Sequence, residues 1–216
     1  MAFAFFDMDG TIIDGDSNDI TYYELNRMKI VDDVFIQKLN NYEDMFYKGI
    51  LDINEFVEFA STPFIKYSMD ELDDLLGAIV RRCIVPKIKK GARDRIESHH
   101  ANNDRVIIVT ATNDYLVKHV AKALDIDDFI ASSMEVNNNH LTGKKLCEVP
   151  FKEGKVRRIR EYLKDEVYSL DGSYGYGDSV NDIEMLLMCE HGFLVDPNEN
   201  MLKDPRVRSM EVISFK

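Results

Sequence analysis

The chain has 216 residues, of which 45% are hydrophobic, and it carries a formal net charge of −12. This length suits one large domain or a core with an inserted module, and the apolar content is enough for a sizeable core. The negative charge argues against a nucleic acid or a membrane surface as partner. No apolar run approaches the ~20 residues that span a bilayer.

The cysteines and the first residues predict a cytoplasmic protein. Cys83, Cys147 and Cys189 are scattered and match no zinc spacing, which is typical of reduced thiols. The chain enters an apolar run without a basic segment before it, so we expect no secretory signal.

The first predicted element is a strand at Phe3-Ala4-Phe5-Phe6, followed directly by Asp7-Met8-Asp9-Gly10-Thr11. Such an apolar run is typical of a buried strand in a parallel sheet, whose carboxyl end faces the ligand crevice. Two carboxylates there repel by about 4 kcal/mol at 4 Å and an effective dielectric near 20. A hard divalent cation would offset this repulsion. A turn with an aspartate cap is the structural alternative.

Residues 16–85 show helical periodicity and no convincing strand. Gly49, Pro63 and Pro86 punctuate this stretch. Helices are predicted around Tyr22–Met28, Val34–Phe46, Ile53–Phe59 and Met69–Cys83.

Beyond Pro86 the pattern alternates between helix and strand. Helices are expected at 88–101, 114–124, 153–164 and from 180; strands at 106–109, 128–132 and 173–176; a hairpin at 134–144; and short elements at 191–195 and 210–213. The pattern predicts an α/β fold, a doubly wound parallel sheet with an inserted helical cap. We expect residues 1–14 and 87–216 to form the core and residues 15–86 to form the cap.

Thr110 lies at the end of the β-branched run Val106–Val109 and precedes Ala111 and Thr112. A hydroxyl and backbone N–H groups at this point can donate to phosphate oxygens. The alternative is that Thr112 or Asn113 only caps the following helix.

Lys155 is expected in the first turn of a helix. A lysine there is usually a solvated side chain, but it opposes the helix dipole, so a nearby anion would explain its position.

A third signal is Gly177-Asp178-Ser179-Val180-Asn181-Asp182, at the end of another short strand. Ser179 and Asp182 fit a capping pair, which leaves Asp178 unexplained. Together with Asp7 and Asp9, the two carboxylates can form an oxygen site of the kind that Mg²⁺ prefers.

These motifs, in this order, resemble those of the haloacid dehalogenase superfamily of phosphatases, with a Rossmann-like core. The helical insertion is similar to the cap of the branch that contains phosphoserine and histidinol-phosphate phosphatases. Gly15-Asp16-Ser17 and Leu141-Thr142-Gly143 resemble its histidinol-phosphatase-like members. The resemblance covers nearly the whole chain.

The resemblance implies a role for each motif. Asp7 would be the nucleophile that forms an aspartyl-phosphate, and Asp9 the general acid and base. Thr110, Ala111 and Lys155 would bind the phosphoryl group. Mg²⁺ would be held by Asp7, Asp9, Asp178 and Asp182. Asp9 also argues against carbon–halogen cleavage, because the dehalogenases lack this acid.

The resemblance also implies that Asp16 and Asn181 face the substrate, a small phosphate monoester. Phosphoserine phosphatases hold the substrate carboxylate with a cap arginine, but no arginine lies between Arg27 and Arg81, and Ala60 falls near its place. Residues 14–86 hold fifteen acidic and seven basic residues. Such a balance usually marks a solvated face. Together with Asp16 and the missing arginine, it favours a substrate with an amine and no carboxylate, such as histidinol phosphate or a phosphorylated amino-alcohol.

Three alternatives remain open at this point: a phosphoserine phosphatase, a phosphotransferase on the same fold, and a silent binding protein. His99, His100, His119, His140 and His191 show no ligand spacing. The oligomeric state does not follow from the sequence.

Overall fold

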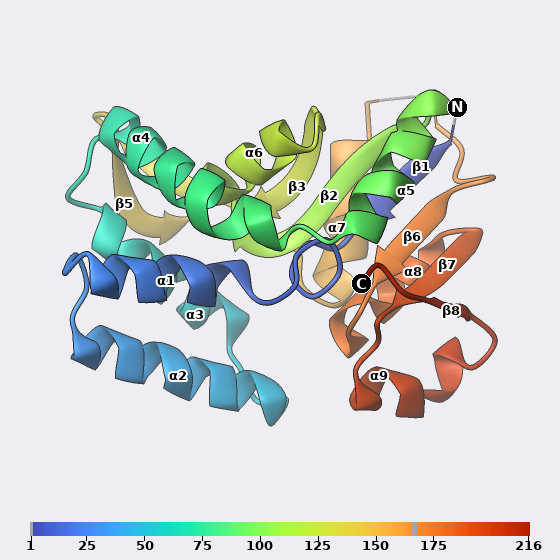
Figure 1. Ribbon diagram of the computed structural model, residues 1–216, viewed down its shortest axis with the longest axis horizontal. Helices are drawn as coiled ribbons and strands as arrows, with labels where there is room; N and C mark the ends of the chain where they lie inside the picture. Colours follow the sequence, from blue (N-terminus) through green and yellow to red (C-terminus); the bar gives the residue numbers. More distant parts are fainter. Residues whose placement is uncertain (1, 166–167) are drawn as a thin grey trace.

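The computed structural model describes residues 2–165 and 168–216 and centres on a six-stranded sheet (Figure 1). All neighbouring strands are parallel, and their order is β3-β2-β1-β6-β7-β8. The strands are β1 (Phe3–Phe6), β2 (Arg105–Asn113), β3 (Asp128–Ser132), β6 (Tyr174–Gly177), β7 (His191–Val195) and β8 (Glu211–Ile213). The predicted α/β class is confirmed.

The central strand β1 is apolar on both faces because both faces are covered. Phe3 and Phe5 pack with α7 (Glu153–Tyr162), α8 (Ile183–Met188) and α9 (Glu199–Lys203). Ala4 and Phe6 point to the other layer, with α5 (Lys90–Ala101) and α6 (Asp114–Ala123). A strand buried on both faces loses the polar alternation of a half-exposed strand, which explains the continuous apolar run.

The insertion after β1 contains four α-helices, which lie beside one end of the sheet (Figure 1). They are α1 (Ser17–Arg27), α2 (Asp33–Tyr47), α3 (Ile53–Ser61) and α4 (Met69–Ile79). Each begins after an aspartate or serine whose side chain accepts backbone N–H groups of the first turn. The expected helix through Cys83 is regular only to Ile79 and continues as a π-helical turn over Val80–Ile84. Residues Val85–Lys87 then form a 3₁₀ turn that includes Pro86, which has no N–H for the bonding of a regular α-helix.

The predicted hairpin consists of β4 (Met134–Asn137) and β5 (His140–Lys145). Asn138 and Asn139 form its turn with φ of 48° and 63°, a left-handed conformation that asparagine tolerates well. The hairpin contacts the insertion, since the Met69 N–H donates to the Asn139 carbonyl at 2.8 Å. The sequence pattern did not indicate α9, a five-residue helix with a single buried residue.

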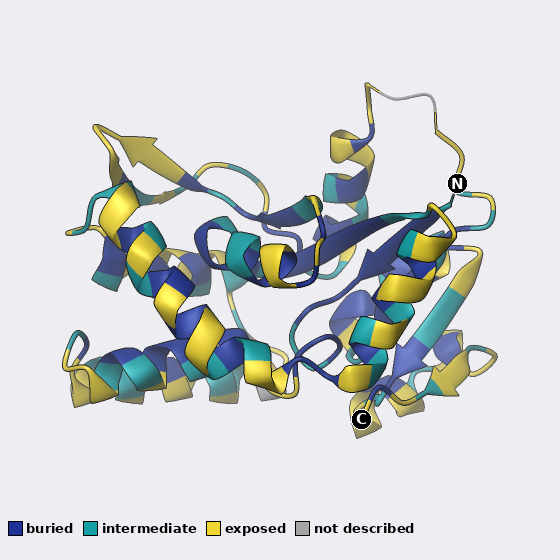
Figure 2. Cartoon of the chain, turned by 45° about the horizontal axis from the view of Figure 1, so that its top comes forward, coloured by how far each residue is buried: buried dark blue, intermediate teal, exposed yellow. Residues whose placement is uncertain are grey.

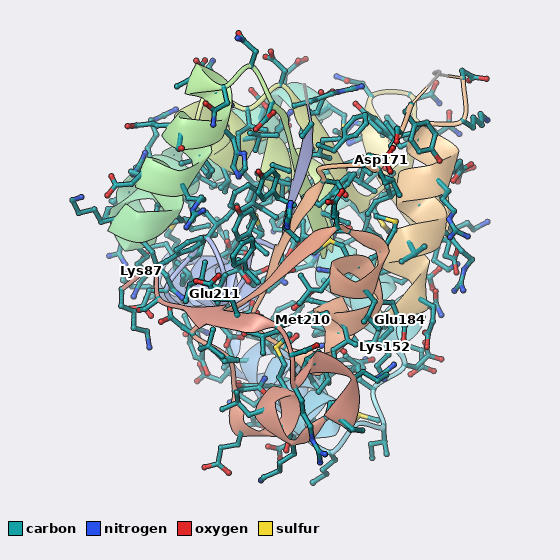
Figure 3. All side chains as sticks on the ribbon, turned by 90° about the vertical axis from the view of Figure 1, so that its right-hand side faces the viewer. Lys87, Lys152, Asp171, Glu184, Met210 and Glu211 are labelled. Atoms are coloured by element: carbon teal, nitrogen blue, oxygen red, sulfur yellow. The ribbon has the colours of Figure 1, made fainter. Side chains whose placement is uncertain are left out.

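Burial follows the layers: β1, β2 and β6 are largely buried, whereas the outer helix faces and most of β4 and β8 are exposed (Figure 2). Strand β8 forms an outer edge of the sheet, and Met210 and Glu211 mark its start in Figure 3. No helix in the described part of the chain combines the length and apolar character that a membrane-spanning segment needs.

Leu76 in α4 tests the contribution of the insertion to stability, because it is fully buried. We expect Leu76→Ala to lower the free energy of unfolding by about 2–5 kcal/mol through lost contacts and a cavity. Chemical denaturation measures the change. Leu202→Ala, at a side chain that is 52% exposed, should change it by less than about 1 kcal/mol. Equal effects of the two substitutions would contradict the packing described for α4.

Candidate active site

A cavity of about 490 Å³ opens at the carboxyl ends of β1, β2 and β6. Its walls come from both the sheet and the inserted helices. Its lining residues include Asp7, Asp9, Asp16, Thr110, Ala111, Lys155, Asp178, Asn181 and Asp182. The structure therefore brings all the residues singled out from the motifs to one cavity.

The side chain of Lys155 is the centre of this site. It is 2% exposed, so the usual expectation of a solvated lysine in a first helical turn is wrong here. Its Nζ donates to Asp7 Oδ1 at 2.6 Å, to Asp182 Oδ1 at 2.6 Å and to the Val109 carbonyl at 2.9 Å. Helix α7 begins beside these strand ends and delivers the ammonium group to two carboxylates and a backbone oxygen.

One lysine does not balance the carboxylates around it. Burial, and next the charge of Asp182, raise the pKa of Asp7 to about 7. Burial, and next the charges of Asp7 and Asp182, raise the pKa of Asp178 to about 8. Lys155 acts in the opposite direction but is outweighed. The site therefore favours protons or another cation.

The donor set fits a divalent metal ion. One oxygen from each of Asp7, Asp178 and Asp182 lies within 4.8 Å of the others. Carboxylate oxygens are the ligands that hard cations such as Mg²⁺ prefer. The raised pKa values of Asp7 and Asp178 point the same way, since bound positive charge would replace the protons.

Asp182 serves two contacts at once. Its Oδ2 accepts the Ser179 backbone N–H at 3.1 Å, in the capping pair that the sequence indicated. Its Oδ1 accepts from Lys155. The capping interpretation and the site interpretation are therefore both compatible with this carboxylate.

Asp9 is held from two sides. Its Oδ1 accepts the Ser17 backbone N–H at 2.6 Å, and its Oδ2 accepts the Thr112 hydroxyl at 2.9 Å. Burial, and next the charges of Asp16 and Asp7, raise the pKa of Asp9 well above its usual range. Sequence reasoning missed these two partners. Thr112 was considered only as a helix cap, and a backbone donor such as Ser17 leaves no sequence signal.

Thr110 and Ala111 lie where β2 meets the cavity. The Thr110 hydroxyl oxygen accepts the Thr112 N–H at 3.2 Å, so its own O–H can donate to an oxygen in the cavity. Asn113 occupies the N-cap position of α6 without a side-chain capping bond. Capping of the following helix by Asn113 therefore does not explain this segment.

The insertion covers the outer part of the cavity. Asp16 caps α1 by accepting from the N–H groups of Asn18 and Asp19, and its exposed side chain lines the cavity. Asp19 and Glu43, which sequence reasoning missed, add two further carboxylates there. The same wall is apolar elsewhere: its residues are Leu39, Tyr42, Phe46, Leu51, Ile53, Phe56 and Phe151.

Residues 4–187 match the family model of haloacid dehalogenase-like hydrolases. The chain belongs to this family. Among similar proteins is a histidinol-phosphatase of Neisseria meningitidis serogroup C, strain 8013, 27% identical over 99% of this chain and 98% of that protein. A phosphoserine phosphatase of Lactococcus lactis is 35% identical over 46% of each chain. These relatives confirm the branch and the enzyme class, a phosphatase.

Solved structures agree on the fold. A protein of unknown function from Bordetella pertussis Tohama I is 26% identical, with a TM-score of 0.90 over 100% of both chains. A phospho-aspartyl intermediate analogue of phosphoserine phosphatase is 18% identical, with a TM-score of 0.70 over 100% of this chain and 93% of that one.

The crowded carboxylates predict a pH-dependent stability in metal-free protein. In the folded protein the pKa of Asp7 is about 7, above its ordinary value of 3.8. The contribution of Asp7 to the free energy of unfolding is therefore complete below pH 4 and is lost as pH rises through 7. Asp7→Asn removes this loss. In EDTA, we expect the variant to gain on the order of 3 kcal/mol over wild type between pH 4 and pH 8.

Urea denaturation across this pH range measures the difference. Asp44→Asn removes one charge from an exposed residue and is the control. A constant difference between Asp7→Asn and wild type at all pH values would contradict the crowding.

Proposed function

We propose that the protein is a Mg²⁺-dependent phosphomonoester hydrolase that acts through an aspartyl-phosphate on a small, amine-bearing metabolite. The observation that carries the proposal is the buried Lys155, bonded to Asp7 and Asp182 in the cavity that Asp178 also lines. This arrangement supports a charged nucleophile beside the positive charge that an incoming phosphoryl group needs.

In the first step, one Asp7 oxygen forms a bond to phosphorus while the bond to the leaving alcohol breaks. Asp9, whose pKa is raised by burial, acts as the acid and gives a proton to the leaving oxygen. In the second step, Asp9 takes a proton from water, which attacks phosphorus and frees Asp7 and phosphate. The Thr110 hydroxyl holds a phosphoryl oxygen throughout, and the Lys155 ammonium supplies positive charge beside Asp7.

When bound, Mg²⁺ would supply further positive charge to the phosphoryl oxygens. Asp7, Asp178 and Asp182 would hold it, with the backbone carbonyl of Asp9. Hydrolysis of phosphate monoesters requires accelerations of up to about 10²¹-fold, so no single group in the cavity is sufficient.

The outer cavity supports an amine-bearing substrate without a carboxylate. Lys155 is the one lysine or arginine among the described residues that line the cavity, and it is bonded to Asp7 and Asp182. Ala60 is 1% exposed, and its carbonyl accepts from the Tyr22 hydroxyl, so it does not replace the cap arginine of phosphoserine phosphatases.

The carboxylates of Asp16, Asp19 and Glu43 offer partners for an ammonium group instead. Burial, and next the charges of Asp16 and Glu43, raise the pKa of Asp19 to about 7, so this wall lacks positive charge of its own. The full-length likeness to a histidinol-phosphatase supports the same substrate class.

The activity itself is tested with Asp178→Ala and a generic aryl phosphate. We expect phosphate release without any added acceptor alcohol, and its loss in EDTA. Asp178→Ala should raise the Mg²⁺ concentration for half-maximal rate far more than it raises the KM for substrate, because Asp178 is assigned to the metal. Undiminished release in EDTA would overturn the metal dependence. Release only in the presence of an acceptor would indicate a transferase.

Asp16→Ala tests the substrate class. If Asp16 pairs with an ammonium, the variant should lose about 30-fold or more in kcat/KM for histidinol phosphate, since truncating one partner of such a pair costs roughly 2–5 kcal/mol. Hydrolysis of an aryl phosphate whose aryl group carries no charge should barely change.

Asp32→Ala is the control, because Asp32 also caps a helix of the insertion, α2, by accepting the Phe35 N–H, and does not line the cavity. It removes a cap without removing a cavity carboxylate. Equal losses on both substrates in Asp16→Ala would reject the amine hypothesis and leave the phosphatase in place.

A further inference from the structure

A second buried lysine, Lys89, lies outside the cavity, where the chain returns from the insertion to α5. Its side chain is 4% exposed, and its Nζ contacts Asp196 Oδ2 at 3.0 Å. The same Nζ donates to the backbone carbonyl of Gly10, in the loop between Asp7 and the insertion. The Lys89 N–H also donates to the Ile12 carbonyl at 2.9 Å. Lys89 therefore connects residues 87–89, the return segment, to the loop that carries Asp7 and Asp9.

Gly10 packs directly on the metal-site carboxylate Asp178. Its φ is 81°, and a Cβ added to it would lie 2.4 Å from Asp178 Oδ2. The next residue, Thr11, donates from its hydroxyl to Asp178 Oδ1 at 3.3 Å. The position of the Gly10 peptide therefore sets how closely the Asp7 loop approaches Asp178.

The segment that begins with Asp196 contacts the backbone of Asp178. Asp196 follows β7 with a φ of 44°, and its side chain accepts from the Ser214 hydroxyl at 2.6 Å and the Phe215 N–H at 3.3 Å. Two residues later, the Asn198 N–H donates to the Asp178 carbonyl at 3.1 Å. The segment that holds Lys89 thus also holds the backbone of Asp178.

The return segment and the C-terminal residues lie together on the side of the molecule that Figure 3 shows, where Lys87 and Glu211 are labelled. The Gly91 N–H donates to the Phe215 carbonyl at 3.0 Å. The Lys89–Asp196 pair therefore lies where the catalytic loop, the return segment and the chain end meet.

Stability alone is a weak explanation for this pair, because a buried ion pair is often no more stabilising than apolar side chains of similar size. Its contacts point instead to geometry. The Lys89 ammonium bonds to the Gly10 carbonyl, in the loop that begins with the proposed nucleophile. Its counterion Asp196 lies two residues before Asn198, whose N–H bonds to the Asp178 carbonyl.

We propose that Lys89 and Asp196 are a positioning pair that sets the separation between the Asp7–Thr11 loop and Asp178, and thereby the affinity of the site for a divalent cation. The proposal rests on the metal site of the proposed function and needs no particular substrate. Neither residue touches the reacting atoms.

Mn²⁺ binding to the substrate-free protein tests the proposal, with Mn²⁺ as a spectroscopic probe that accepts the same oxygen ligands as Mg²⁺. Lys89→Met removes the ammonium and keeps most of the volume. Its Kd for Mn²⁺, measured by electron paramagnetic resonance, should rise about 10-fold or more, the effect typical of groups that orient metal ligands. The kcat should fall similarly, with the KM within about twofold.

Lys90→Met is the matched control, since Lys90 is the next residue and its exposed side chain pairs with the exposed Asp94. It should leave the Kd for Mn²⁺ unchanged. A Lys89→Met protein with a lowered Tm but the Kd of the control would overturn the positioning role. If wild type binds no Mn²⁺, the metal site itself fails, and the pair loses its role with it.

Asp196→Asn gives a second test that does not depend on the folding of Lys89→Met. It keeps one oxygen, which can accept the Phe215 N–H, and its amide N–H can donate to the Ser214 hydroxyl, but it removes the charge that holds Lys89. We expect the Kd for Mn²⁺ to rise about 3-fold or more. The Kd of the double variant for Mn²⁺ should be no higher than that of Lys89→Met alone, because the two substitutions remove the same interaction. Fully additive losses, or an unchanged Kd in Asp196→Asn, would contradict a coupled pair.

Discussion

The site depends on one buried ammonium group that faces more negative charge than it can neutralise. Lys155 bonds to Asp7 and Asp182, while burial, and next the charges of Asp7 and Asp182, raise the pKa of the nearby Asp178 to about 8. A folded protein tolerates such crowding only when protons or a cation relieve it. On the proposed mechanism, the same excess of carboxylates holds the cation that lets an anionic nucleophile approach a phosphate.

The two parts of the chain contribute different chemistry. Ends of the parallel strands and the first turn of α7 place the carboxylates and the lysine, and the sheet fixes them because its central strand β1 is buried on both faces. The insertion supplies the apolar and acidic outer wall. Asp9 is where the two meet, since it accepts from Ser17 of α1 and from Thr112 of β2. The proposed acid is therefore oriented by the insertion as well as by the core.

The sequence predicted the features that depend on short-range pattern. The apolar run before Asp7, the Gly-Asp end of β6 and the asparagine turn of the hairpin each have a local cause, so their elements were found. Contacts between distant segments had no such signal. The burial of Lys155, the hydroxyl of Thr112 on Asp9 and the Lys89–Asp196 pair depend on how strands and loops meet in space. Asp19 and Glu43 looked like ordinary surface charges of amphipathic helices and became part of the cavity only through the placement of α1 and α2.

The central claim is that Asp7, beside Lys155, is the group that takes the phosphoryl from the substrate. Borohydride added during turnover reduces an acyl phosphate to an alcohol, and peptide mass spectrometry locates the modified residue. The account predicts conversion of Asp7 to homoserine, only when substrate and Mg²⁺ are both present, and much less conversion when Lys155 is replaced by Met. Modification at another residue, or steady turnover with Asp7 never modified, would contradict it.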